Sequence, residues 1–224
     1  MNLQDIYLIG EVPKINTAEI QAQVTFKVPQ DYLKFMQKFG QGDISEILIF
    51  WQASPDFFKL NFAEYPDLWD WDDPTLLEKV TNSLYIASTI DGDDIYIIDD
   101  KEKPYVIMPR HGLHPLTFTS LKAVLDYYIK LYDLKDDLYF NSSFNQKIAS
   151  FPIQKQDFST FKNQLIEQFQ HDKVFNIETQ AKFIYQEIGG WIYIDPMYQK
   201  TIRIKYQTQF EEKAKPYLEI IKDF

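Results

Sequence analysis

The stretch SLYIASTIDGDDIYII, residues 83–98, determines the fold class that we expect for this chain. Two runs rich in Ile and Tyr, at 83–90 and 95–98, flank an Asp-Gly-Asp-Asp sequence at 91–94. β-Branched and aromatic residues favour strands, and Asp-Gly between two apolar runs is typical of a hairpin turn. The stretch therefore predicts two antiparallel strands joined by an acidic turn.

Helices and further strands are predicted on both sides of this hairpin. The apolar residues of 32–39 recur at i, i+3, i+4 and i+7 after Pro29, and Gly40 follows them, which predicts a short amphipathic helix ending at Gly40. The run 44–51 reads as a buried strand, 54–74 as irregular, and 105–108 as another strand. Residues 119–132 predict a helix with one apolar face, which Thr119 or Ser120 caps.

A second set of elements follows a polar stretch at 141–147, which we interpret as a connector. It comprises a helix near 157–169, strands at 182–188, 191–195 and 201–206, and a terminal helix, and so forms an α-β-β-β-α extension. We therefore expect two domains, 1–140 and 141–224. The predicted fold class is α+β, with a mainly antiparallel central sheet flanked by helices.

Charge is distributed unevenly between these two parts. The whole chain has 33 acidic and 23 basic residues, a net charge of −10. Residues 56–102 contain 13 acids and 3 bases (3 − 13 = −10), whereas 141–224 contain 10 acids and 11 bases (11 − 10 = +1). Such a charge disfavours nucleic acids and anionic membranes as partners and favours cationic proteins. The acidic excess predicts a local patch for a basic protein partner.

Residue patterns typical of catalytic and cofactor sites do not occur in the sequence. Cys is absent, so there are no disulfides, thiolate ligands or thiol nucleophiles. The seven Gly form neither phosphate-binding fingerprint, and no Gly-x-Ser-x-Gly is present. His111 and His114 are three apart without a third ligand at a recognisable spacing, which favours a polar turn. We expect no enzymatic activity, no cofactor and no metal.

The chain carries no sign of membrane insertion or export. Its first residues lack the cationic start and apolar run of a secretory signal, and no stretch approaches 18 uninterrupted apolar residues. We therefore expect a cytoplasmic protein.

The segment EYPDLWDWDDP at 64–74 is the strongest candidate for a binding site. Tyr and Trp provide large, rigid contact areas, and carboxylates around them attract Lys and Arg of a partner. In the alternative interpretation the two Trp residues hold a long loop on the core while the acids face water. Candidate partner-binding residues in this segment are Glu64, Tyr65, Asp67, Trp69, Asp70, Trp71, Asp72 and Asp73.

The acids of the hairpin form a second candidate group. Asp91, Asp93 and Asp94, with Asp99 and Asp100, place carboxylates near one end of the sheet, and hard cations accept such ligands. Their order does not match the EF-hand pattern, so an acidic hairpin turn is the favoured interpretation. We add Asp91, Asp93 and Asp94 to the partner-binding candidates.

Three motifs resemble a known family. VPQDYLKFM at 28–36, with Gly40 and Gly42 after it, resembles the Leu-Pro-x-Asp-Tyr-x-x-Phe-Leu … Gly-Gly signature of the SUKH superfamily. LYIASTIDGDDIYIID at 84–99 is similar to that family's Ile-Ala … Gly-Asp hairpin, and 118–132 to its final helix. The resemblance covers about residues 15–135. Gln41 interrupts the usual Gly pair, and 141–224 resemble nothing in the family.

The resemblance implies an α+β fold and a binding role without catalysis. The superfamily includes bacterial immunity proteins of polymorphic toxin systems and a fungal cell-wall synthesis regulator. We therefore expect an immunity protein that neutralises a cognate basic toxin domain, such as a nuclease or deaminase. The alternative is an intracellular scaffold or regulatory module with 191–206 as a second docking surface. In a third interpretation, the chain is a carboxylate-dependent enzyme that uses the acidic residues of 91–100 with a divalent cation.

Overall fold

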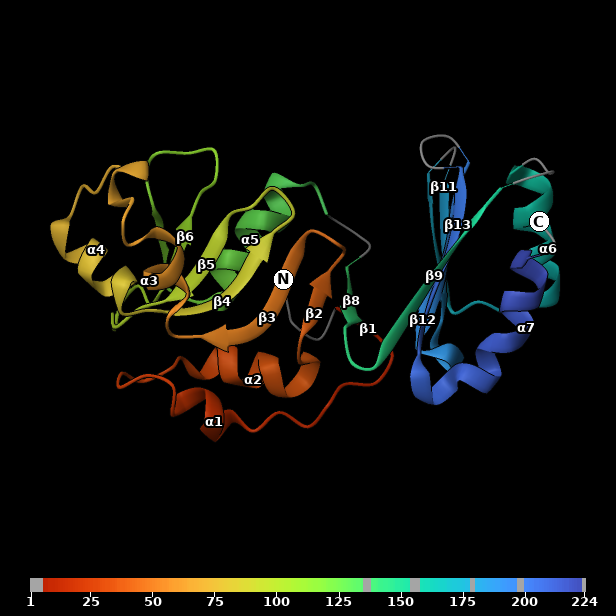
Figure 1. The fold of residues 1–224 in the computed structure, drawn as a ribbon, viewed down its shortest axis with the longest axis horizontal. Coiled ribbons are helices and arrows are strands. Elements are labelled where there is room, and N and C mark those ends of the chain that lie inside the picture. Colours follow the sequence, from red (N-terminus) through yellow and green to blue (C-terminus); the bar gives the residue numbers. More distant parts are fainter. Residues whose placement is uncertain (1–5, 135–137, 154–157, 178–179, 197–199, 223–224) are drawn as a thin grey trace. The chain divides into compact units, whose positions relative to one another are not determined.

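The computed structural model describes residues 6–134, 138–153, 158–177, 180–196 and 200–222 (Figure 1). The chain divides into two compact units, 1–7 with 12–140 and 8–11 with 141–224. The main boundary thus falls between Phe140 and Asn141. The structure also places Leu8–Glu11 in the second unit, which the sequence did not indicate.

The helices and strands between residues 7 and 142 include those of the first unit, and β1 and β8 extend across its boundaries. They are β1 (Tyr7–Ile9), α1 (Thr17–Gln21), α2 (Gln30–Phe39), β2 (Gly42–Ile44), β3 (Leu48–Ser54), α3 (Phe57–Phe62), the 3-10 helix η1 (Pro66–Leu68), α4 (Pro74–Thr81), β4 (Leu84–Thr89), β5 (Asp94–Ile97), β6 (Tyr105–Met108), β7 (Leu116–Phe118), α5 (Leu121–Leu131) and β8 (Tyr139–Ser142). The larger sheet has the order β1-β8-β2-β3-β4-β5-β6-β7, and the pairs from β2 to β7 whose register is described are antiparallel. The α+β class with a mainly antiparallel sheet is therefore confirmed.

The predicted hairpin and first helix both form. Strands β4 and β5 pair in antiparallel fashion around a turn in which Gly92 has a φ of 90°, a left-handed value that favours glycine. Helix α2 begins directly after Pro29 and ends at Gly40, whose φ is 68°. Helix α5 begins after Ser120, whose hydroxyl accepts a hydrogen bond from the Ala123 amide.

The predicted single strand at 44–51 is wrong. The chain instead turns at Ser45 and Glu46, which both have positive φ, so that β2 and β3 form a hairpin. The Asp43 carboxylate accepts a hydrogen bond from the Glu46 amide at 2.7 Å and closes this turn. The sequence did not reveal the turn because neither Ser45 nor Glu46 is a Gly, Asn or Asp, the residues that most often adopt positive φ.

Helices cover both faces of the larger sheet. In β6, Tyr105 donates a hydrogen bond to Asp31 of α2, whereas the adjacent Val106 packs in a cluster with Phe58 of α3 and Val80 of α4. Successive side chains of a strand point to opposite faces, so α2 and the α3–α4 pair lie on opposite sides. Residues 54–74, predicted as irregular, thus contain a helix and a 3-10 turn.

In the residues of the second unit that the structure describes, a five-stranded antiparallel sheet packs with two α-helices. Its elements are β9 (Gln146–Pro152), α6 (Phe158–Gln168), β10 (Lys173–Ile177), β11 (Gln180–Tyr185), the 3-10 helix η2 (Gln186–Ile188), β12 (Gly190–Asp195), β13 (Thr201–Gln207), the 3-10 helix η3 (Thr208–Phe210) and α7 (Glu211–Lys222). The strand order is β10-β11-β12-β13-β9. Phe161 and Leu165 of α6 and Tyr217 of α7 pack in one core with Phe183 and Ile204 of the sheet. The structure adds β9 and β10 to the three predicted strands, and the expected connector 141–147 instead contains the ends of β8 and β9.

Candidate functional site

The two tryptophans of the acidic segment point into the protein. Trp69 is only 8% exposed, packs against Phe58 and Phe62, and its indole N–H donates to the Pro109 carbonyl at 2.9 Å. The half-buried Trp71 donates its indole N–H to the Pro66 carbonyl at 2.6 Å. Both rings therefore hold the loop between α3 and α4 on the sheet. This packing is what the alternative interpretation expects of the two rings, and their role as partner contacts stays a prediction.

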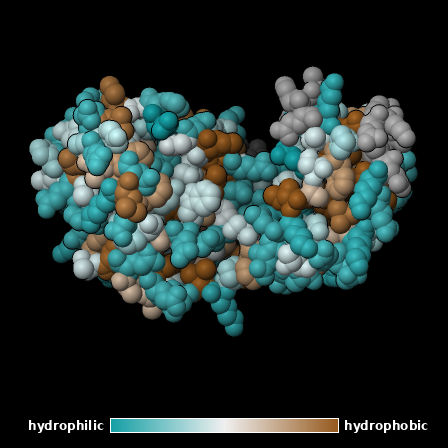
Figure 2. All heavy atoms as spheres, in the orientation of Figure 1, coloured by the Kyte–Doolittle hydropathy of each residue, from teal (hydrophilic) through white to brown (hydrophobic). Residues whose placement is uncertain are grey.

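The carboxylates of the same segment face solvent. Glu64, Asp67, Asp70, Asp72 and Asp73 are all exposed. Within the part of the chain that the structure describes, no ion pair is formed by Glu64, Asp67 or Asp70. On the face drawn in Figure 2, the end of the first unit that carries α3 and α4 is mainly hydrophilic, with isolated hydrophobic residues among the polar ones. Exposed carboxylates agree with both interpretations of this segment, and its role in partner binding stays a prediction.

Two of these acids have local roles. Asp73 caps α4, because its carboxylate accepts hydrogen bonds from the Thr75 amide at 2.9 Å and from the Thr75 hydroxyl. Both bonds favour the ionised form and lower the pKa of Asp73. Asp72 lies 3.8 Å from the Nδ1 atom of His114, and both side chains are largely exposed. Asp73 therefore contributes to folding as well as to surface charge.

Exposed apolar side chains accompany the acids. Leu60 of α3 is 81% exposed, and Tyr65 and Leu68 are both more than half exposed. Leu113 belongs to the same surface, because its carbonyl accepts a hydrogen bond from the Asp70 amide and its side chain is exposed. Apolar groups surrounded by charged ones are the usual composition of a protein-binding surface. We call the exposed residues of 60–73 together with Leu113 the acidic-apolar surface.

The three acids of the hairpin turn have different environments. Asp91 accepts a hydrogen bond from the Tyr132 hydroxyl at 2.6 Å. Asp93 accepts one from the Arg110 amide at 2.8 Å and one from the Tyr128 hydroxyl at 3.0 Å, and so joins the turn to β6 and α5. Both residues are therefore used largely to hold the turn in place. Asp94 differs, because its side chain enters a pocket.

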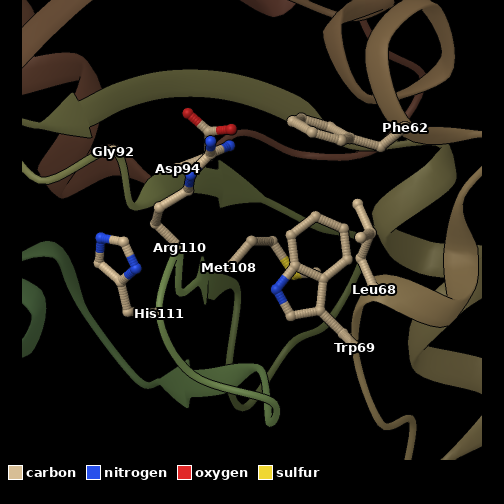
Figure 3. A pocket seen from close by; sticks show the side chains of 8 residues that line it. All are labelled: Phe62, Leu68, Trp69, Gly92, Asp94, Met108, Arg110 and His111. Atoms are coloured by element: carbon tan, nitrogen blue, oxygen red, sulfur yellow. The ribbon is translucent and has the colours of Figure 1, made fainter.

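This pocket lies between the α3–η1 segment and the ends of β5 and β6, with a volume of about 460 Å³ (Figure 3). Its apolar wall consists of Phe62, Leu68, Trp69 and Met108. Asp94, Gly92, Arg110 and His111 form the other wall. Asp94 of β5 pairs with Met108 of β6 in antiparallel fashion, so the two walls meet at this pair. Arg110 follows Met108 by two residues and lines the pocket on the side of Asp94. Leu68 and Trp69 belong both to this pocket and to the segment behind the acidic-apolar surface.

Burial sets the ionisation of Asp94. Removal of its carboxyl from water is the largest influence and raises the pKa of Asp94 to about 6, and Asp93 contributes in the same direction. A hydrogen bond from Tyr96 and the charge of Arg110 oppose the shift. The Tyr96 hydroxyl is 3.5 Å from the Asp94 carboxylate, a long separation for a hydrogen bond. Among the described residues, no basic group lies within 4.0 Å of this carboxylate.

The remaining sequence candidates do not form a recognised chemical site. No group of three His, Asp or Glu residues within the described ranges is arranged to hold a metal ion. His111 and His114 are both exposed. Among the described helices, none is long and apolar enough to cross a membrane. Comparisons of the chain with protein-family models, curated proteins and solved structures found no match.

Sequence reasoning found the acids but not the pocket. Phe62, Met108 and Arg110 were not candidates, because they come from a helix, a strand and a loop that the sequence does not place side by side. The available signal was indirect. Asp94 directly precedes the predicted strand 95–98, and in the structure this strand pairs with 105–108 so that Met108 lies opposite Asp94.

Proposed function

We propose that this chain is a non-catalytic immunity protein that neutralises a basic bacterial toxin domain by binding it. The toxin is a nuclease or deaminase of a polymorphic toxin system, and binding takes place in the cytoplasm of the cell that produces both proteins. The proposal combines the resemblance of residues 15–135 to the SUKH superfamily with the acidic-apolar surface. The single observation that supports it most strongly is the exposure of Glu64, Asp67 and Asp70 without an ion pair among the described residues.

Physical reasoning connects this surface to a basic partner. An enzyme that acts on nucleic acid needs positive charge near its active site, since phosphates contribute most of the binding energy. An acidic protein surface attracts such a site over a distance and raises the association rate. Leu60, Tyr65, Leu68 and Leu113 then supply apolar contact area once the surfaces meet. Charge sets the rate of encounter, and the apolar side chains contribute to the lifetime of the complex.

The scaffold alternative receives less support from the fold. It used the strands at 191–206 as a docking edge, and edge strands are what an extended peptide recognises. However, β12 and β13 lie inside the smaller sheet, which has β10 and β9 at its edges. In β12 and β13, the described strands of this range, a peptide therefore has no free edge to pair with.

The test begins with the gene neighbourhood, where the proposal expects a long reading frame with a variable basic C-terminal domain, and continues with co-expression of the chain and that domain. We expect the chain to restore growth of cells that produce this domain and to bind it when both are purified. If the chain fails to restore growth, and calorimetry detects no binding, the proposal is contradicted. Pull-down that returns housekeeping or signalling proteins in place of the toxin domain supports the scaffold alternative.

A charge-reversal pair locates the interface. Asp67→Lys with Asp70→Lys changes the net charge from −10 to −6, and Glu167→Lys with Glu219→Lys on α6 and α7 makes the same change in the second unit. We expect the first variant to slow association at low salt by about ten-fold or more, and the second to change it by less than about two-fold. Equal slowing by both variants would show that net charge, and not the acidic-apolar surface, determines binding.

A further inference from the structure

The pocket beside Asp94 has features of a receptor for one long cationic side chain. Its apolar wall includes the ring of Trp69 and the side chains of Phe62, Leu68 and Met108, which suit the methylene groups of a long side chain. An aromatic face of Trp also attracts a guanidinium group. In Figure 3 the apolar wall stands on one side of the pocket and Asp94 on the other. The methylene groups of an entering side chain would therefore contact the apolar wall, and its charged group would face Asp94.

The Asp94 carboxylate has few close partners for a charged group in a cavity. It is partly buried, its hydrogen bond from Tyr96 is long at 3.5 Å, and no basic group among the described residues lies within 4.0 Å of it. An ionised carboxylate that leaves water is costly unless a cation or strong donors face it. A guanidinium that enters the pocket provides both charge and paired donors. The free pocket thus contains an acceptor whose interactions are incomplete.

We propose that this pocket receives an arginine side chain of the basic partner, with the Asp94 carboxylate as its acceptor and Trp69 against its guanidinium or its stem. The inference rests on the proposed function and names the anchor residue of that interface. Leu68 connects the two sites, because its exposed side chain belongs to the acidic-apolar surface and also lines the pocket. Arginine is among the residues that most often contribute large binding energies in interfaces.

The cationic groups already in the pocket define the competing chemistry. Arg110 and His111 line the same wall as Asp94, and a carboxylate or phosphate could pair with them instead. Charge complementarity favours a cation, because the turn also contains Asp91 and Asp93 and residues 56–102 have a net charge of −10. An anion that approaches this part of the molecule meets a repulsive field before it meets Arg110. Binding of an anionic probe is therefore an outcome of the test that overturns the inference.

The test uses the full-length protein and small probes. N-acetyl-arginine methylamide is titrated to millimolar concentration while the four indole N–H signals are followed by NMR, with N-acetyl-glutamate methylamide as the matched anionic probe. We expect a saturable shift of the Trp69 signal with the arginine probe alone. Trp51 does not line the pocket and serves as the internal control, since its N–H group bonds to Ser88. No shift of Trp69, or a shift with the glutamate probe only, overturns the inference.

Two substitutions complete the test. Asp94→Asn removes the acceptor charge at nearly constant size, and we expect it to abolish the response of Trp69 to the arginine probe. Asp99→Asn, at an exposed position outside the pocket, is the matched control and should leave the response unchanged. Leu68→Ala tests the apolar wall at an exposed position that is not needed for the core, and it should weaken the response. Unchanged responses in Asp94→Asn and Leu68→Ala contradict the proposed contacts.

The same variants separate this inference from the proposed function. Against a toxin domain that the chain binds, Asp94→Asn should raise the dissociation constant by about ten-fold or more, and Asp99→Asn by less than about two-fold. If the toxin binds and Asp94→Asn has no effect, the pocket assignment is wrong and the proposed function stands. If the arginine probe binds and no toxin domain does, the pocket assignment stands and the proposed function is wrong.

Discussion

At the scale of single residues, Asp31 connects three elements of the first unit. Its carboxylate accepts hydrogen bonds from the Tyr105 hydroxyl at 2.6 Å, from the Leu121 amide at 2.7 Å and from the Tyr32 amide at 3.0 Å. The donors belong to β6, to the first turn of α5 and to α2 itself. Asp31 lies in the sequence stretch that resembles the SUKH signature, and the structure gives this position a physical role.

Asp31→Ala should therefore destabilise the first unit. Loss of a charged acceptor leaves the buried Tyr105 hydroxyl and the Leu121 amide without their partner, so we expect the free energy of unfolding to fall by about 2–3 kcal/mol. Urea denaturation followed by tryptophan fluorescence measures the change. Lys34→Ala, at an exposed position of the same helix, is the control and should change the free energy by less than about 0.5 kcal/mol. Similar effects of both substitutions would contradict the connecting role of Asp31.

The raised pKa of Asp94 predicts that the stability of the chain depends on pH. Because burial raises its pKa to about 6, the folded chain binds this proton more readily than the unfolded chain does. The contribution of Asp94 to the free energy of unfolding therefore decreases as pH rises from about 4 to about 6. Asp93, Arg110 and Tyr96 are the groups that act on it.

Asp94→Asn removes this titration. We expect the variant to gain stability relative to the parent chain between pH 4 and pH 7, as measured by urea denaturation at several pH values. A carbon-detected NMR titration of the Asp94 carboxyl should give a midpoint near 6 in the parent chain. A difference in stability that is constant over this range would show that Asp94 is not buried as described.

At the scale of elements, Gly190 fixes the close approach of β12 to β13. A Cβ atom at this position would overlap the backbone carbonyl of Lys205, which cannot move without distortion of β13. Gly190→Ala should therefore lower the free energy of unfolding of the second unit by about 3 kcal/mol. Amide hydrogen exchange in β12 and β13 measures the effect. Ser150→Ala on the exposed side of β9 is the control, and fast exchange in that variant as well would contradict the explanation.

Local elements differed in how well the sequence predicted them. The hairpin of β4 and β5 and helix α2 follow from strong local signals, namely Asp-Gly between apolar runs and a Pro and Gly at the ends of an amphipathic stretch. The segment 54–74 carried no such signal. Helix α3 is only six residues long, and it is held by contacts of Phe58 and Phe62 with Trp69 rather than by its own propensity. Short elements of this kind depend on tertiary packing.

At the scale of the whole molecule, a segment from the beginning of the chain is built into the second unit. The buried side chain of Gln207 in β13 accepts a hydrogen bond from the Glu11 amide at 2.8 Å and donates one to the Glu11 carbonyl at 2.7 Å. It also donates to the Phe144 carbonyl at 3.0 Å. The Gly10 amide adds a hydrogen bond to the Gln186 side chain. Residues 8–11 therefore complete a unit whose other residues lie 130 or more positions later.

Gln207→Ala should release this segment and destabilise the second unit. Three hydrogen bonds between the Gln207 side chain and backbone groups are lost, so we expect a decrease of about 2–3 kcal/mol in its free energy of unfolding and faster exchange of the Glu11 amide. Gln209→Ala is the control, since Gln209 donates to the side chains of Glu11 and Gln207 and to no backbone group of the segment. If the Glu11 amide exchanges at the parent rate in Gln207→Ala, the segment is held by other contacts. A fragment that contains only 141–224 lacks these residues altogether and should be less stable than the unit in the full chain.

Sequence alone determined the α+β class, the central hairpin, the helix before Gly40 and the concentration of charge between residues 56 and 102, because each depends on local spacing or on composition. Only the tertiary structure decided which residues of that region face water. It buries Trp69, assigns Asp93 to the turn and Asp73 to a helix cap, and leaves Asp94 in a pocket with Met108 and Arg110. The physical reason is that burial and strand register depend on residues distant in sequence, whose positions no local pattern specifies.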